Sequence, residues 1–118
     1  MVASPTQRTL QRCRKLGMTA TVVEHWNSFA RIRQDMFGCI DIVALKEDAI
    51  VGIQATSTPN IRARIKKATQ LPALRAWLKA GGRFEVWGWK KNDRGRYDLT
   101  IVDINEEYLP KTTDGEDS

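Results

Sequence analysis

One carboxylate inside an apolar stretch constrains this chain more than any other feature. Residues 37–59 read FGCIDIVALKEDAIVGIQATSTP, in which two apolar runs flank a charged break of three residues. Both runs are rich in β-branched residues, and the break has hairpin length, so the pattern predicts two antiparallel strands over residues 39–45 and 49–53. Asp41 lies inside the first predicted strand, where a charge is unfavourable unless it is paired or binds a metal. Asp41 is therefore the first candidate for a functional residue.

Two further polar residues accompany Asp41. Gln54 follows the second apolar run directly, so the predicted pairing brings it to the neighbouring strand. Glu24 lies near the end of another predicted strand, residues 18–26, and alternation puts it on a face with apolar residues. The structural alternative for Glu24 is an ion pair with one of the nearby arginines.

Length and composition indicate one soluble domain. The chain has 118 residues, of which 42% are hydrophobic and 28% charged, and this is enough for one core. No apolar run approaches the roughly 20 residues of a membrane span. The N-terminus lacks the apolar core of a signal peptide, so we expect a cytoplasmic protein with no membrane partner. Two cysteines and one histidine are too few for a Cys/His zinc site.

Charge is unevenly distributed along the chain. Residues 1–102 hold 18 Lys and Arg against 8 Asp and Glu, whereas residues 103–118 hold 1 against 6. We therefore predict a basic domain over residues 1–109 and an acidic flexible tail over residues 110–118. A basic domain of this size favours a phosphate-bearing partner. The alternative is a basic surface that is merely solvated.

The pattern of elements predicts an α/β fold with a single mixed β-sheet flanked by helices. Ser4, Pro5 and Gln7 predict a capped helix that ends before Gly17. Thr58 and Pro59 predict the start of a second helix, Pro72 opens a third, and residues 83–90 and 96–104 have the composition of strands. The predicted order is helix, strand, strand, strand, helix, helix, strand, strand. The connection through the two middle helices is long enough for parallel pairing.

Basic residues gather in two segments that we predict to contact nucleic acid. The segment 27–36 is expected to be a loop, and the helix after Pro59 carries four cations beside its apolar stripe. The alternative is that these cations form only the solvated face of an amphipathic helix. The candidates are Arg31, Arg33, Arg62, Arg64, Lys66 and Lys67.

This layout resembles the PD-(D/E)XK nuclease superfamily, in particular its archaeal Holliday-junction resolvases and its VRR-NUC branch. Phe37-Gly38-Cys39-Ile40-Asp41 is similar to the Gly-x-Pro-Asp segment of the family, and Gln54-Ala55-Thr56 is similar to its acid-x-Lys segment. The resemblance covers roughly residues 5–90 and rests on topology and spacing. It implies a restriction-endonuclease-like core.

The resemblance also implies a metal-dependent active site. Phosphodiester hydrolysis in this family uses Mg²⁺ or Mn²⁺, which prefers oxygen ligands, and an acid on each of two neighbouring strands supplies them. The implied metal ligands are Asp41, Gln54 and Glu24, with Asp35 as a further acid that can join Asp41. Gln54 replaces the family's acid and Thr56 replaces its lysine. Lys66 or Arg62 on the following helix is expected to supply the missing cation.

Two hypotheses follow from this site. The first is a metal-dependent endonuclease that hydrolyses DNA, including branched or junction DNA, with Asp41, Gln54, Glu24 and Lys66 as catalytic residues. The second is a nucleic-acid-binding or assembly module on the same fold that has lost its chemistry. The polar residues in apolar strands favour the first, and the missing lysine favours the second. The resolvase resemblance further implies a homodimer.

Overall fold

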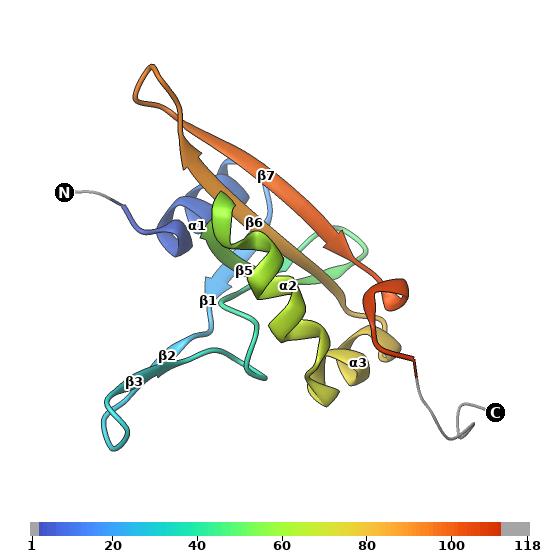
Figure 1. Ribbon diagram of the computed structural model, residues 1–118. Coiled ribbons are helices and arrows are strands. Elements are labelled where there is room, and N and C mark those ends of the chain that lie inside the picture. The colour runs from blue at the N-terminus through green and yellow to red at the C-terminus, as the bar shows by residue number, and fades with distance from the viewer. Residues whose placement is uncertain (1–2, 112–118) are drawn as a thin grey trace.

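A mixed five-stranded sheet forms the centre of the molecule, with strands in the order β1-β4-β5-β6-β7. The computed structural model describes residues 3–111. Figure 1 shows the long strands β5, β6 and β7 crossing the molecule, with helices packed against them. The strands of this sheet are β1 (Thr19–Val22), β4 (Ile42–Leu45), β5 (Ile50–Ser57), β6 (Arg83–Lys91) and β7 (Tyr97–Ile104).

The pairing within the sheet is antiparallel except at one position. β5 and β6 are parallel, and the chain passes between them through a 3-10 turn (η1, Thr58–Asn60) and two helices, α2 (Ile61–Thr69) and α3 (Pro72–Lys79). β4 and β5 pair antiparallel with Ile42 opposite Ile53. The expectations of a strand pair around the charged break and of a parallel crossover are both confirmed.

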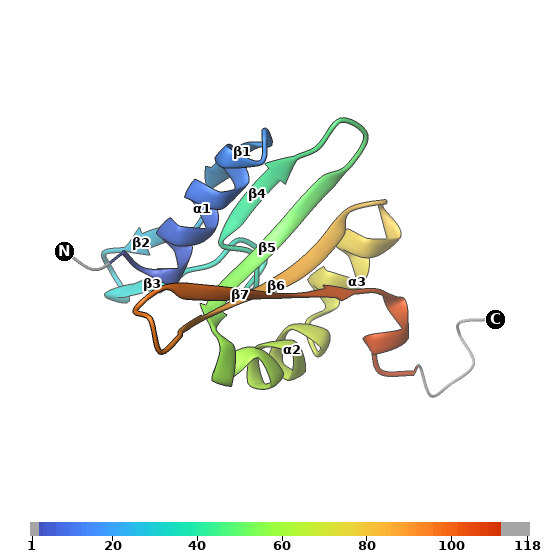
Figure 2. The ribbon, with the colours of Figure 1, turned by 90° about the horizontal axis from the view of Figure 1, so that it is seen from above.

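Helices cover both faces of the sheet, each over its own apolar cluster. α1 (Pro5–Lys15) packs with Cys13 against a cluster that includes Ile42, Ile53 and Trp87. α2 and α3 cover a second cluster, which includes Phe84 and Val86. Figure 2 shows α1 on one side of the sheet and α2 on the other. The predicted fold class, α/β with one mixed sheet flanked by helices, is confirmed.

The start of α1 follows from its sequence. The Ser4 hydroxyl accepts a hydrogen bond from the Gln7 N–H, and the Ser4 N–H donates to the Gln7 side chain, which completes the predicted capping box. The predicted cap of the next helix is wrong. Thr58 lies in the 3-10 turn and its buried hydroxyl has no partner among the described residues, while Asn60 occupies the cap position of α2.

The segment between β1 and β4 differs from its predicted structure. The predicted strand over residues 18–26 is divided into β1 and a short β2 (His25–Asn27), and the predicted loop contains β3 (Ile32–Gln34). β2 and β3 pair with each other to form a separate hairpin. β1 pairs with β4 only as far as Ile42. The next two N–H groups, of Val23 and Glu24, donate to the Asp41 carbonyl, and from His25 onward the chain pairs with β3 instead.

The strand predicted over residues 39–45 begins later, at Ile42. Phe37 and Gly38 have positive φ angles, 56° and 83°, and they turn the chain tightly so that the Ile40 N–H donates to the Met36 carbonyl. Asp41 therefore lies immediately before the strand rather than in its middle. Its N–H still donates to the Ile53 carbonyl, so it remains aligned with β5.

The last element in the described part of the chain is a 3-10 turn, η2 (Glu106–Tyr108). The predicted acidic tail lies outside the described residues from 112 onward; Pro110, its first residue, accepts a hydrogen bond from the Arg75 side chain. Among residues 3–111, no helix is long and apolar enough to cross a membrane.

Candidate metal centre

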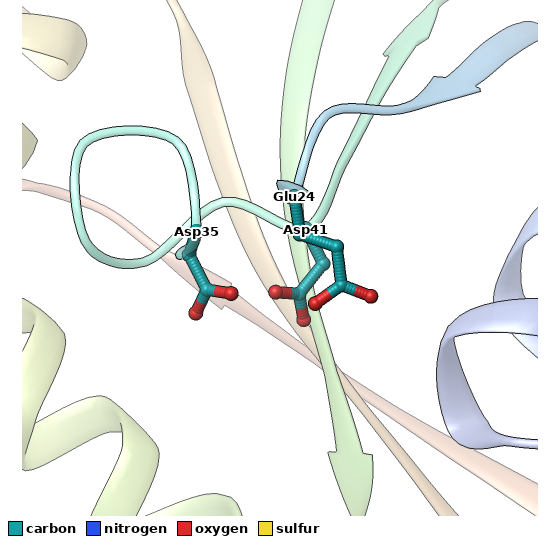
Figure 3. A group of neighbouring side chains, drawn as sticks. All are labelled: Glu24, Asp35 and Asp41. Atoms are coloured by element: carbon teal, nitrogen blue, oxygen red, sulfur yellow. The ribbon is translucent and has the colours of Figure 1, made fainter. Parts of the chain in front are cut away.

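Three carboxylates from three separate segments meet beside the first residue of β4. Glu24 lies between β1 and β2, Asp35 directly follows β3, and Asp41 directly precedes β4. One carboxylate oxygen from each lies within 4.8 Å of the others. In Figure 3, the Glu24 and Asp41 side chains lie next to each other and Asp35 approaches from the neighbouring loop. We call these three residues the acidic cluster.

Backbone hydrogen bonds hold the three segments together. The Asp41 carbonyl accepts from the Val23 N–H at 2.8 Å and from the Glu24 N–H at 3.4 Å. The tight turn after Asp35 returns the chain to β4, because the Met36 N–H donates to the Ile40 carbonyl at 2.8 Å. The cluster is thus fixed by the main chain rather than by flexible side chains alone.

Asp41 is the buried member of the cluster, with 5% of its surface exposed. Its Oδ2 atom accepts a hydrogen bond of 2.9 Å from the Ala55 N–H. Burial raises the pKa of Asp41 to about 8, and a hydrogen bond with the Asp35 carboxyl and the charges of Asp35 and Glu24 act in the same direction. The Ala55 N–H opposes this shift. Without a cation at the cluster, Asp41 is therefore protonated more readily than an exposed aspartate.

Gln54 joins the cluster through Asp35. It is 4% exposed on β5, and its Nε2 atom donates to Asp35 Oδ2 at 3.3 Å. Thr56, two residues further along the same strand, is also buried. Asp35 contacts both Gln54 and Asp41, so it links the two neighbouring segments.

The donor set fits a hard divalent cation. Three carboxylates and the oxygen of a carboxamide are the ligand types that Mg²⁺ and Mn²⁺ prefer. Among the described residues, one ion pair reaches the cluster: the Arg33 guanidinium lies 3.9 Å from Glu24, and the Arg33 side chain is 68% exposed. One exposed cation does not offset the charge of the three carboxylates, so a divalent ion would be stabilised here.

A groove borders the cluster on the side of α2. It measures about 610 Å³, and Asp35, Arg33, His25, Phe37 and Lys67 contribute to its wall. A smaller hollow of about 400 Å³ lies on the other side of Arg33, between Glu24 and the start of α1 with Gln7. Asp35 thus lines one of these hollows and Glu24 lines the other.

The basic residues that we predict to contact nucleic acid do not all lie on one surface of the protein. Arg33 and Lys67 line the groove beside the cluster, whereas Arg62 and Lys66 line a separate groove of about 490 Å³ with Tyr108. Neither Lys66 nor Arg62 lines the groove that contains Asp35, and the expectation that one of them supplies the cation at the site stays a prediction. Lys67 lines this groove.

The remaining predicted residues lie at the edges of these surfaces. Arg31 is exposed in the turn between β2 and β3, and Arg64 is half-buried on α2. The sequence indicates Asp35 only as an additional acid, yet in the structure it contacts both Gln54 and Asp41. The signal that identifies it is the hairpin: residues at the two ends of a hairpin lie side by side, as Glu24 and Asp35 do.

Comparison of the sequence with protein-family models and with curated proteins found no match.

Proposed function

We propose that this protein is a metal-dependent endonuclease that hydrolyses phosphodiester bonds in DNA with Mg²⁺ or Mn²⁺. The observation that carries the proposal is the gathering of Glu24, Asp35 and Asp41 within 4.8 Å, next to a groove lined by Arg33 and Lys67. An acidic cation site beside basic side chains is the combination that a phosphodiester requires: the cation contacts the scissile phosphate, and the basic groups hold its neighbours.

The resemblance to the PD-(D/E)XK superfamily is part of this proposal. In support, α1, β1, β4, β5, α2 and β6 follow one another as the resemblance implies, with the β2–β3 hairpin as an addition. Asp41 and Gln54 also lie on the neighbouring segments that correspond to the two motifs of that family.

Each residue of the site has a separate task in this proposal. Asp41, Asp35 and Glu24 would hold the cation, and Gln54 would turn its amide oxygen toward it. A bound divalent cation supplies positive charge at the phosphate and makes a water molecule more acidic. Lys67 and Arg33 bind the phosphates of the DNA strand in the groove. The Ala55 N–H fixes the orientation of the Asp41 carboxylate.

The alternative is a nucleic-acid-binding module without catalysis. Thr56 favours it, because this buried residue stands where the resemblance implies a lysine and carries no positive charge. The two functions share the groove and the fold, and they differ in whether a bond is broken.

Cleavage of labelled DNA distinguishes these functions. Wild-type protein is incubated with linear, gapped and four-way-junction DNA, with Mg²⁺, with Mn²⁺ and with a chelator. We expect metal-dependent cleavage that falls by at least about 100-fold in Asp41→Asn, while Asp48→Asn, a change at an exposed acid of the β4–β5 turn, leaves it unchanged. Binding of DNA without cleavage of any substrate contradicts the endonuclease and supports the binding module.

A further inference from the structure

The β2–β3 hairpin connects two members of the acidic cluster. Glu24 directly precedes β2, and Asp35 directly follows β3. Figure 1 shows the hairpin projecting away from the main sheet, with its turn at the far end. Because both ends of the hairpin are fixed at the cluster, whatever the turn binds is held at a set distance from the cation site.

Large apolar side chains on this hairpin have no cover within the described part of the chain. Phe29 in the turn is 100% exposed, Trp26 on β2 is 57% exposed and Ile32 on β3 is 50% exposed. Exposed apolar groups gathered on one projecting element mark a contact site more often than scattered single ones do. The hairpin therefore presents an uncovered aromatic end.

The turn that carries Phe29 is held in one conformation. The Asn27 side-chain oxygen accepts hydrogen bonds from the Phe29 N–H and the Ala30 N–H, each 3.0 Å long. The Arg31 N–H donates to the Asn27 carbonyl at 2.7 Å, and Arg31 has a φ of 57°, which is unusual for a residue other than glycine. A turn that is already ordered presents its aromatic ring with little further loss of entropy on binding.

The charge of the hairpin indicates what it contacts. Residues 25–34 contain two arginines, Arg31 and Arg33, and no aspartate or glutamate. A second copy of this chain would bring like charges together if two hairpins met. A nucleic acid complements both the arginines and the aromatic side chains of the hairpin. Its phosphates attract arginine, and the faces of its bases stack on aromatic rings.

We propose that Phe29 stacks on an unpaired base of the DNA substrate, while Arg31 contacts the adjoining phosphate. This inference rests on the proposed function and adds its substrate class. In a fully paired duplex each base face is already stacked on a neighbour, so a ring such as that of Phe29 finds its partner at a gap, bulge, branch or single strand.

The reach of the hairpin adds a geometric expectation. Phe29 lies about four strand residues from the cluster, which at about 3.3 Å per residue corresponds to roughly 13 Å. Along the axis of B-DNA, successive nucleotides of one strand are about 3.4 Å apart. For a strand that runs along the hairpin at this spacing, the stacked base is expected about four nucleotides from the phosphate at the cation site.

Binding without metal tests this inference independently of cleavage. The anisotropy of labelled DNA is measured in chelator for a paired duplex and for the same duplex with an unpaired 2-aminopurine, whose fluorescence reports stacking. The variants are Phe29→Leu, which keeps an apolar side chain without a ring, and Phe29→Trp, which keeps a ring. Ile101→Ala, at a 46% exposed position on β7, is the matched control.

We expect wild type to prefer the duplex with the unpaired base and to quench its fluorescence. Phe29→Leu should weaken that binding by about 5- to 150-fold, the range for the loss of one stacked base. Phe29→Trp and Ile101→Ala should bind as wild type does. Paired duplex should be bound equally by all four proteins, because it offers no free base.

Each other result has a defined meaning. If Phe29→Leu binds the unpaired site as tightly as wild type, the stacking role is overturned and the endonuclease proposal remains. If Phe29→Leu leaves DNA binding unchanged and Phe29→Asp converts a dimer to a monomer in sedimentation, the hairpin is an interface between copies and the inference is overturned. Absence of all DNA binding overturns both proposals. Binding that depends on Phe29, with no cleavage in Mg²⁺ or Mn²⁺, supports the inference and contradicts the endonuclease.

Discussion

Asp41 Oδ2 accepts a hydrogen bond of 2.9 Å from the backbone N–H of Ala55 on the neighbouring strand. This contact directs a carboxyl with 5% exposure toward Glu24 and Asp35. Without a bound cation, the arrangement opposes ionisation of Asp41, since burial and two further acids act against one N–H donor.

The first prediction concerns the pH dependence of stability without metal. Because the folded pKa of Asp41 is about 8 against an ordinary value of 3.8, the folded state binds the extra proton between these values. The contribution of this group to stability therefore falls as pH rises from about 4 to 8, by up to about 1.4 kcal/mol per pH unit. Asp41→Asn lacks the titrating carboxyl, so its free energy of unfolding should not show this decrease. Relative to wild type, the variant should therefore become more stable as the pH rises.

Urea unfolding in chelator at several pH values between 5 and 8 measures this difference. The matched control is Asp48→Asn, because Asp48 is exposed in the turn between β4 and β5. Its stability curve should run parallel to that of wild type. If the Asp41→Asn curve is also parallel to wild type, the carboxyl is not protonated in the folded protein.

The second prediction concerns protons released on metal binding. Below pH 8, a cation that binds at the cluster must displace the proton of Asp41, so each binding event should release close to one proton. The affinity for Mn²⁺ should rise up to about tenfold per pH unit between pH 6 and 7.5 and level off above pH 8. Titration calorimetry in two buffers of different ionisation enthalpy counts the protons. Equal heats in both buffers at pH 7 would exclude the coupling.

The third prediction separates two adjacent lysines on α2. Lys67 shares the groove of Asp35, whereas Lys66 lines the groove with Tyr108. Lys67→Glu should lower the rate of cleavage at saturating DNA, because it places a negative charge beside the reacting phosphate. Lys66→Glu, the same change one residue earlier, should leave that rate unchanged. The opposite result would restore Lys66 to the catalytic role expected from the sequence.

Salt titrations of the same pair measure how many phosphates each lysine neutralises. The logarithm of the binding constant falls linearly with the logarithm of salt concentration. This negative slope should become shallower by about 0.9 for each phosphate of duplex DNA that a variant no longer neutralises. If the slope is unchanged in both variants, both side chains belong to the solvated face of α2.

Much of the fold follows from local sequence signals, and the exceptions have physical reasons. The capping box of Ser4 and Gln7 and the strand composition of residues 83–90 are local signals, and the structure agrees with both, with β6 over Arg83–Lys91. The start of β4 depends on Phe37 in a conformation with positive φ, which favours glycine and is not predicted for phenylalanine. The short hairpin strands could not be predicted because three residues are too few for a periodic pattern.

The same holds for the site. Asp41 and Gln54 stand out in sequence because they interrupt apolar strands, and both are buried beside the cluster. Asp35 has no such signal, because it follows a polar segment rather than interrupting an apolar run, and it reaches the cluster only through the hairpin. The choice between Lys66 and Lys67 depends on the rotation of α2 about its axis. The apolar pattern of the sequence does not fix this rotation finely enough to distinguish two adjacent residues.

The fourth prediction concerns Gln54→Glu. In wild type the Gln54 amide donates to Asp35, and glutamate would replace this donor with a further negative charge. The variant should therefore lose stability in chelator and gain affinity for Mn²⁺, because the added charge is repelled by the acids and attracted by the cation. Thermal unfolding with and without Mn²⁺ measures both effects. A variant that is destabilised equally in both conditions would indicate that Gln54 does not face the cation.

A calorimetric titration of Mn²⁺ into metal-free protein tests the metal centre most directly. We expect one site in wild type, retained in the control Asp48→Asn and weakened by at least about tenfold in Asp41→Asn, because the number of charged ligands sets the affinity of such sites. A site of equal affinity in all three proteins, or no site in wild type, would contradict a metal centre at Glu24, Asp35 and Asp41.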